Sequence, residues 1–461
     1  MSLVNTILLQ NCEKFINQVI GFFSGGKIRA IEEMETELKK LTDKFILDTM
    51  NAYLESLDKA IVEDKIGRKR KGIVVERKND KRELYTVFGH LRFNRTYFYD
   101  KRHQEYSYLL DKVVGLEKYD RVSGTVAVNL VEHASQYSYA KSTQNVTGGS
   151  ISRQTVMKKV RALKELKMEC PSPKRVVKVL HIDADEDHVA LQDGSNTMVP
   201  LISIYEGVVR TGNRSQCLNI HHISSYGKKP EDLWLEAANW IYDVYEVEAI
   251  ERIYLHGDGA QWIKEGLKWL PKAKLVLDKY HLNKAILQVI GNQPERRREI
   301  YSAIRNSDQT LFRRIANELL SKAASDSERK RIKDFKRYVL NNWQAITIYT
   351  EETCGGSGPE GHISHVLSSR LSSRPMGWSR EGLRAMAELR AYTSSGGKIT
   401  LKHLKQEQKK TYRLGKSIAS KVSDDFFKTW EQLNNVPILG HGKVIPMFRC
   451  LRDIQNGSFY L

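Results

Sequence analysis

The spacing of hydrophobic positions changes several times along the chain, and each change predicts a different kind of element. Residues 1–65 place apolar side chains at three- and four-residue intervals, which is typical of amphipathic helices. Residues 83–99 instead alternate β-branched and aromatic residues with charged ones around Gly89, which predicts a β-hairpin. We expect a turn at Asn79 and Asp80 in the basic stretch before it. Residues 66–118 therefore form a predicted basic hairpin region.

Residues 119–170 return to a helical spacing. A short helix at 138–146, a turn at Gly148 and Gly149 and a second helix at 153–166 have the pattern of a helix-turn-helix. The second helix would bury Val156, Val160 and Leu163. We expect it to contact DNA through its exposed side chains, although a surface helix with solvated lysines is the alternative. These exposed side chains are Arg153, Gln154, Lys158, Lys159 and Arg161.

After Pro171 and Pro173 the pattern changes to strands that alternate with helices. Strands are predicted at 174–182, 188–192, 198–205, 216–224, 253–256 and 274–277, and helices at 230–245 and 263–270. This order is that of a ribonuclease-H-like domain, whose first part we assign to residues 174–281. Residues 282–352 are helical in pattern and predict an all-α insertion. The core would resume at 353–395, and a basic C-terminal region, 396–461, would follow. We expect its strongly basic residues 400–422 to lie on DNA or to be partly flexible.

The predicted fold class is therefore α+β and multidomain. A helical N-terminal region with a helix-turn-helix would bind DNA, and a ribonuclease-H-like α/β core interrupted by helices would carry the chemistry.

Composition narrows the choice of partner. The 461 residues include 74 Lys and Arg against 55 Asp and Glu, a net charge of +19, which favours a polyanion partner, either nucleic acid or an anionic membrane surface. The five cysteines are scattered without CxxC spacing, so we expect neither a disulfide framework nor a cysteine-based zinc site, and a reducing cytoplasm fits. The longest run without a charged residue, 338–350, is too short to span a membrane, and the N-terminus lacks the features of a secretory signal.

Acidic residues stand where the predicted strands end. Asp183 and Asp185 in HIDAD alternate and would face the same side, Asp258 in HGDG follows a later strand, and Glu360 follows a glycine-rich loop. Ligands bind at the carboxyl ends of strands in open α/β sheets, and clustered carboxylates need cations to neutralise them. We therefore expect Mg²⁺ or Mn²⁺, two ions about 4 Å apart, at this edge. Asp187 is a further candidate ligand, whereas His362 and His365 do not form a zinc pattern.

Several stretches carry a resemblance to a known family. They are HIDADEDHVALQ, YLHGDGAQWI, LDKYHLNKAI, GPEGHISHVLSSRLSSRPMGWS, SYAKSTQNVTGGSISRQTV and YTVFGHLRFNRTYFYD. Over these segments, from about residue 80 to about residue 385, the chain resembles bacterial insertion-sequence transposases of the ISLre type, within the DDE superfamily. The resemblance implies Asp185, Asp258 and Glu360 as the catalytic, metal-binding triad. Relatives often carry Glu in place of Asp183, which favours Asp185 over Asp183 as the first ligand.

Two further groups of residues receive roles. Asp278 and His281 resemble the C/DxxH element of related transposases and would support the site, although a helix cap with a surface histidine is the alternative. Arg370, Arg374 and Trp378 follow the helix of Glu360, where arginine could grip phosphate and tryptophan could stack on a base. Ion pairs and a core tryptophan would be the structural alternative.

The resemblance implies a transposase that binds terminal inverted repeats and catalyses metal-dependent DNA cleavage and strand transfer. It would work as a homo-oligomer on DNA in the bacterial cytoplasm, away from membranes. Two alternatives remain open. One is a nuclease or junction resolvase of the same fold without strand transfer, and the other is a DNA-binding regulator with an inactive catalytic fold.

Overall fold

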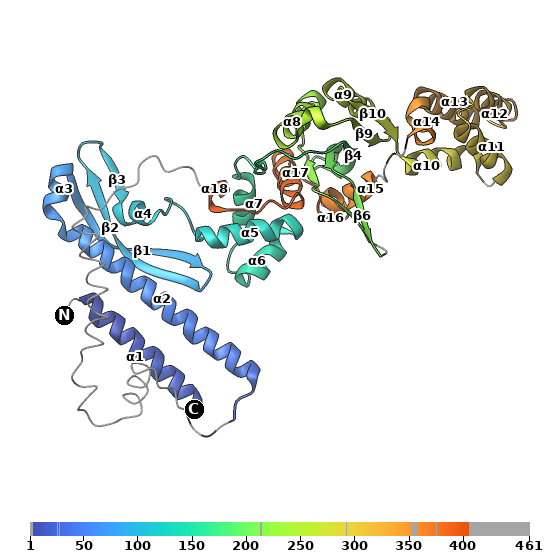
Figure 1. The fold of residues 1–461 in the computed structure, drawn as a ribbon. Coiled ribbons are helices and arrows are strands. Elements are labelled where there is room, and N and C mark those ends of the chain that lie inside the picture. The colour runs from blue at the N-terminus through green and yellow to red at the C-terminus, as the bar shows by residue number, and fades with distance from the viewer. Residues whose placement is uncertain are drawn as a thin grey trace. The chain divides into compact units, whose positions relative to one another are not determined.

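The computed structural model describes residues 3–404 except 25, 27, 213, 292, 353, 355–357 and 375 (Figure 1). Most of the predicted basic region 396–461 therefore lies outside the described residues. The described residues fall into two compact units, 3–127 and 128–404. The architecture is mixed α/β and multidomain, as the sequence predicts. None of the helices in the described residues is long and apolar enough to cross a membrane.

The first unit packs helices on an antiparallel sheet. Its elements are α1 (Leu3–Phe23), α2 (Ile31–Glu63), α3 (Lys65–Lys71), β1 (Ile73–Thr86), β2 (Gly89–Asp100), β3 (Glu105–Tyr108) and α4 (Leu109–Val114). The strands pair in the order β1-β2-β3. The apolar stripe of α2, with Leu57 and Ile61, packs with Phe98 of β2 and Leu110 of α4, and each of these side chains is almost completely buried. Removing this apolar surface from water is the main stabilising contribution to the unit.

One prediction in this unit is wrong. The chain does not turn at Asn79 and Asp80, because β1 runs on from Ile73 to Thr86 with irregular pairing between Val75 and Asp80. The positive φ of Asn79 (61°) accommodates the irregularity without ending the strand, as in a β-bulge. The start of the basic stretch, Lys65–Lys71, forms the helix α3, which the sequence pattern did not predict. The hairpin itself is present, with its turn between Thr86 and Gly89.

Three helices open the second unit, of which the first, α5 (Gly124–Gln136), spans the border between the units. The others are α6 (Tyr139–Thr147) and α7 (Arg153–Arg161), joined by a turn in which Gly148 and Gly149 have φ of 56° and 81°. Ser138 and Ser152 cap them, because each hydroxyl accepts a backbone N–H of the first turn. The helix α7 ends at Arg161 and not at the predicted residue 166. Beyond it the backbone N–H of Lys164 donates to the carbonyl of His403, so the chain no longer follows the helix.

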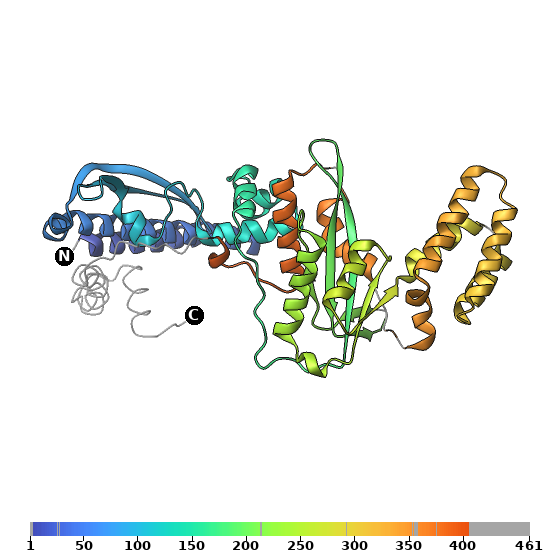
Figure 2. The same cartoon turned by 90° about the horizontal axis from the view of Figure 1, so that it is seen from above.

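A five-stranded mixed sheet forms the centre of the second unit (Figure 2). Its strands are β4 (Val179–Ala190), β5 (Asn196–Tyr205), β8 (His221–Ile223), β9 (Arg252–Gly257) and β10 (Ala273–Leu277), paired in the order β10-β9-β4-β5-β8. β5 follows β4 through a short turn and is antiparallel to it, and β8, which follows residues 206–220, is antiparallel to β5. β9 and β10, reached through helices, run parallel to β4. A short link makes a hairpin and a helical link makes a crossover, which accounts for the directions of β5, β9 and β10.

One face of the sheet is apolar. Leu180, Ile182 and Ala184 alternate along β4 and pack with α8 (Pro230–Val244) and α9 (Gln261–Trp269). Trp234 of α8 is fully buried, and a Cβ on Gly266 of α9 would lie 2.8 Å from its ring, so this crossing requires glycine. The opposite face of β4 carries His181, Asp183, Asp185 and Asp187.

Two strand predictions are corrected. Residues 174–182 and 188–192 are not separate strands, because β4 is a single strand that starts only at Val179. The acidic run in its middle hid the continuity, since its side chains face a polar site instead of the core. The predicted strand 216–224 is divided by Asn219, which has φ of 52°. Its first part, β7 (Arg214–Cys217), pairs with β6 (Val208–Thr211), which was not predicted, and its second part is β8.

Residues after β10 are helical, as predicted. They form α10 (Lys279–Ile290), α11 (Pro294–Arg305), α12 (Gln309–Ser321), α13 (Asp326–Asn341) and α14 (Trp343–Glu351). Ile300, Phe312 and Phe335 occupy their common core. The chain then enters the segment that carries Glu360. Its elements are α15 (Pro359–His362), a π-helical turn (Ile363–Ser368) and α16 (Ser369–Leu371), followed by α17 (Arg380–Ser394) and α18 (Leu401–Leu404).

Candidate metal centre

Asp183, Asp185 and Asp187 lie on the same face of β4, because successive side chains of a strand point to opposite faces. Residues 359–371 run along this face as a helical segment with a π-helical turn. Pro359 stands at the first helical position, where its missing N–H costs nothing, and Glu360 follows it in the first turn. The strand and the helical segment together determine which of the three aspartates remain available for a ligand.

Asp183 holds the start of the helical segment. Its Oδ2 accepts the backbone N–H of Gly358 at 2.9 Å and lies 3.4 Å from Nε2 of His362, while its Oδ1 accepts the hydroxyl of Tyr205 at 3.0 Å. Although burial opposes the charge on His362, its contact with Asp183 raises the pKa of its imidazole to about 9. Asp183 is 1% exposed and both of its oxygens are occupied, so it positions the helix instead of facing a ligand.

Asp187 holds the other end of the same segment. Its Oδ1 accepts the hydroxyls of Ser368 at 3.0 Å and Ser372 at 2.8 Å. The two serines are four residues apart and therefore lie on one side of the helix. Asp183 and Asp187 thus anchor residues 358–372 to β4 at two points, with Asp185 between them.

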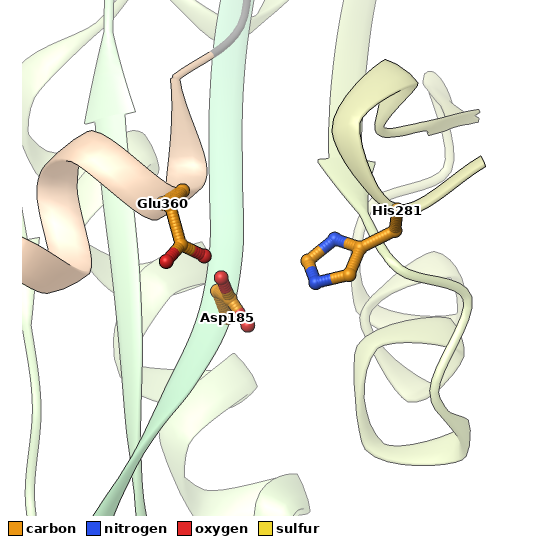
Figure 3. A group of neighbouring side chains, drawn as sticks. All are labelled: Asp185, His281 and Glu360. Atoms are coloured by element: carbon orange, nitrogen blue, oxygen red, sulfur yellow. The ribbon is translucent and has the colours of Figure 1, made fainter. Parts of the chain in front are cut away.

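Asp185 faces Glu360 across this gap. One ligand atom each from Asp185, Glu360 and His281 lie within 4.8 Å of one another, and Figure 3 shows the two carboxylates side by side with the imidazole turned toward them. The three residues come from β4, α15 and α10, which are far apart in the sequence. Ligand atoms on opposite sides of an ion with bonds of about 2.1 Å are about 4.2 Å apart, so a small contraction would let the three share one ion.

His281 is oriented by Asp278. Its Nδ1 lies 3.1 Å from Oδ2 of Asp278, a residue that is 5% exposed and precedes α10. An aspartate before a helix usually accepts an N–H of the first turn, but the Asp278 side chain makes no such capping bond. With Nδ1 engaged, Nε2 is the imidazole nitrogen left for a ligand, which is the carboxylate–histidine arrangement of many metal sites.

The electrostatics of the group favour a cation. Burial raises the pKa of the Asp185 carboxyl to about 6, and the neighbouring charges of Glu186 and Asp258 add to this effect. The hydrogen bond to Asp278 raises the pKa of His281, with a further contribution from the charge of Asp185. A proton or a bound cation among these side chains therefore stabilises their clustered negative charges.

Asp258 lies beside this group but outside it. It follows β9, and its Oδ1 accepts the N–H of Ala260 at 2.8 Å, although its charge is felt by both Asp185 and His281. The flanking glycines have local roles. A Cβ on Gly257 would lie 2.7 Å from Cδ1 of Ile263, and Gly259 has φ of +87°. The expected Asp185–Asp258–Glu360 triad is thus incomplete among the described residues, with His281 in the place expected for Asp258.

The expected DNA-contacting residues divide into two groups. Arg153, Gln154 and Lys158 of α7 are exposed, as is Arg374, whereas Lys159 and Arg161 are partly buried. Val156 and Val160 are buried as predicted. The exposed residues remain candidates for contact with phosphate or bases.

Arg370 and Trp378 are corrections. Arg370 is 5% exposed, its Nε donates to the carbonyl of Ala134 at 2.9 Å, and its guanidinium lies 4.9 Å from the Trp378 ring centroid. Trp378 is 7% exposed and its Nε1 donates to the carbonyl of Leu371. Neither side chain is available to grip a phosphate or stack on a base, because Arg370 bonds to α5 and Trp378 packs against Arg370 and bonds to Leu371.

Comparison with known proteins places the chain in a family. The model of an uncharacterised protein family, UPF0236, matches residues 27–410. A UPF0236 protein of Caldanaerobacter subterraneus subsp. tengcongensis is 40% identical over 459 residues, covering 97% of both chains, and another, matching to the same extent, has a name that joins eleven locus designations. A UPF0236 protein "in vanSb 3'region" of Streptococcus gallolyticus is 26% identical, covering 80% of this chain and 85% of the relative. The chain that carries this Asp–His–Glu group belongs to the UPF0236 family.

Proposed function

We propose that this protein is a DNA transposase of an insertion sequence, with a ribonuclease-H-like catalytic core and a helix-turn-helix formed by α6 and α7. The convergence of Asp185 and Glu360 from distant parts of the chain, with ligand atoms within 4.8 Å, is the observation that carries the proposal. The strand order β10-β9-β4-β5-β8 supports the core assignment. Eleven loci under one protein name in a relative's genome also fit an element that copies itself.

The residues divide the chemistry among them. Asp185, Glu360 and His281 would hold a divalent ion, Mg²⁺ or Mn²⁺, and Asp258 beside them would share in holding a second. When bound, such ions neutralise the negative charge of the phosphate oxygens and lower the pKa of the attacking water or hydroxyl. Without a cation the two carboxylates would repel both each other and a DNA phosphate. Asp183 and Asp187 keep Glu360 opposite Asp185.

DNA would be held by the basic surfaces. The N-terminal end of α7 presents Arg153 and Gln154, and the N-terminal residues of a recognition helix are those that reach base edges. Arg374 would contact phosphate near the metal centre. Two element ends must be joined in transposition, so we propose that at least two copies of the chain assemble on DNA, in the bacterial cytoplasm.

The test uses the full-length protein and duplexes that carry the terminal repeats flanking its gene. We expect nicking at the repeat end and joined products with a target duplex in Mn²⁺ or Mg²⁺, both lost in Glu360→Gln. The matched control is Glu381→Gln, because Glu381 is an exposed glutamate of α17 in the same unit. Cleavage without joined product would identify a nuclease instead. Binding of the repeats without cleavage would identify a regulator, and activity that survives Glu360→Gln would remove the assignment.

A further inference from the structure

The three side chains of the candidate centre do not all offer oxygen. His281 contributes an imidazole nitrogen to a group whose other ligand atoms are carboxylate oxygens of Asp185 and Glu360. Mg²⁺ is a hard ion that prefers oxygen and keeps much of its water, whereas imidazole suits first-row transition ions. The nature of the third ligand therefore bears on which ion the site selects.

His281 has the local support that a metal ligand needs. Nδ1 contacts Asp278 at 3.1 Å, which leaves Nε2 for the site, and Figure 3 shows the ring directed at the carboxylates. Asp278 is itself fixed, since its backbone N–H donates to the carbonyl of Gly257 at 2.8 Å and its side chain is buried. The carboxylate of Asp278 orients the imidazole at the expense of capping α10.

The remaining geometry fits one shared ion with open positions. Asp185 and Glu360 are held on opposing elements by the Asp183 and Asp187 anchors, and His281 approaches from α10. Glu360 is exposed and His281 only partly buried, so the side of the group away from β4 is accessible to water or to a phosphate. Three protein ligands with accessible positions are typical of catalytic rather than structural metal sites.

We infer that His281 is a direct metal ligand, and that with Asp185 and Glu360 it forms a centre that binds a first-row divalent transition ion such as Mn²⁺ in preference to Mg²⁺. Asp278 is a positioning residue of this centre, because it acts through His281. The inference deepens the proposed function and rests on the same site, but it concerns ion binding by the protein without DNA.

The test measures binding of Mn²⁺ alone, and of Mg²⁺ by competition, to the full-length protein by electron paramagnetic resonance. Pulsed measurements also detect a ¹⁴N nucleus coordinated to Mn²⁺. We expect tighter binding of Mn²⁺ than of Mg²⁺ and a ¹⁴N coupling in the unaltered protein. His281→Gln should lose the coupling and weaken Mn²⁺ binding at least about tenfold, with a smaller effect on Mg²⁺, and Asp278→Asn should weaken Mn²⁺ binding about tenfold while the coupling remains.

The matched control is His188→Gln, because His188 is an exposed histidine on the opposite face of β4. It should change neither affinity nor coupling. Equal affinities for the two ions, or a ¹⁴N coupling that persists in His281→Gln, would overturn the inference. The result is independent of the proposed function. A nitrogen-coordinated Mn²⁺ in a protein that does not cleave DNA leaves the inference intact, and DNA joining by a protein that does not prefer Mn²⁺ leaves only the transposase proposal.

Discussion

The carboxylate of Asp183 accepts the backbone N–H of Gly358 at 2.9 Å, which joins the middle of β4 to the residue directly before the helical segment of Glu360. This contact spans 175 positions of the sequence. It explains how a helix end next to a glycine-rich loop can present Glu360 at a defined distance from Asp185. A hydrogen bond to a charged acceptor contributes about 1.5–3 kcal/mol, enough to favour one placement of the loop.

Removal of this contact should loosen the metal centre without removing a ligand. In Asp183→Ala we expect Mn²⁺ affinity to fall about 10–100-fold, the usual effect of losing an outer-shell partner, with partial recovery in Asp183→Asn because its amide oxygen can still accept one hydrogen bond. Calorimetric titration with Mn²⁺ measures both.

Asp243→Ala is the control, since Asp243 is exposed on α8. It should bind Mn²⁺ like the unaltered protein. Normal Mn²⁺ affinity in a folded Asp183→Ala protein, checked by circular dichroism, would show that Gly358 does not need this anchor.

Sequence patterns were reliable where one physical signal dominated. The amphipathic spacing around Trp234 located α8, and the proline before Glu360 located the start of α15. The alternation of Asp183 and Asp185 correctly placed both on one face. It did not distinguish their roles, since those depend on Tyr205 and Gly358, which are distant in sequence.

Other features required tertiary structure. Arg370 and Trp378 have residue types that suit DNA contact, but their burial depends on the contact of Arg370 with Ala134 of α5 and of Trp378 with Arg370, which no local pattern reveals. The role of His281 was partly visible, because the three-residue spacing from Asp278 puts both on one side of a helix start. How close His281 comes to Asp185 depends on the position of α10 relative to the sheet. The spacing of Ser368 and Ser372 was a signal for the Asp187 anchor that the sequence analysis missed.

Substitution of Asp258 should reduce DNA cleavage much more than it reduces Mn²⁺ binding. Asp258 lies outside the three-residue group. In the absence of DNA, Asp258→Asn should therefore weaken Mn²⁺ binding less than loss of an outer-shell partner does, which is about tenfold. DNA cleavage should nevertheless fall by about two orders of magnitude or more, the effect of losing one electrostatic stabiliser of a transition state. Calorimetry and a nicking assay on the same preparation measure the two effects. Equal losses of Mn²⁺ binding and cleavage would instead make Asp258 a ligand of the first ion.

Substitution of Arg370 should lower the stability of the protein, whereas substitution of Arg374 should weaken DNA binding. Arg370→Gln removes a buried charge-assisted hydrogen bond to Ala134, so the free energy of unfolding should fall by about 1.5–3 kcal/mol. Arg374→Gln alters an exposed side chain, so it should leave stability within about 0.5 kcal/mol and weaken DNA binding. Urea denaturation and fluorescence anisotropy with a labelled duplex test the pair. Normal stability in Arg370→Gln would contradict the structural role.

The exposed basic residues of α7 predict a salt effect. If Lys158 neutralises one phosphate, Lys158→Gln should reduce the slope of log K against log salt concentration by about 1. Lys268→Gln is the control, because Lys268 is an exposed lysine of α9 that pairs with Glu265. Affinity for a terminal-repeat duplex at several salt concentrations gives the slopes. An unchanged slope in Lys158→Gln would place α7 away from the phosphates.

Two histidines at the start of β8, the partly buried His221 and the buried His222, should make the protein less stable in mild acid. Burial lowers the pKa of His221 to about 4 and that of His222 to about 3. In the unfolded chain both would titrate near 6.5, so below that pH the unfolded state binds more protons than the native state. Their contribution to stability is complete above about pH 6.5 and is lost as the pH falls toward 4, at up to about 1.4 kcal/mol per pH unit for each histidine.

Asp185 acts in the opposite direction, because its pKa is raised to about 6 and its native carboxyl takes up a proton first. The contribution of the histidines is therefore measured by comparing the free energy of unfolding of a histidine variant with that of the unaltered protein. The free energy of unfolding of His222→Gln, from urea denaturation between pH 7 and 4.5, should depend less steeply on pH than that of the unaltered protein. The exposed His188→Gln should follow the unaltered protein throughout. If both variants show the same pH dependence, burial does not lower the pKa of His222 in the native state.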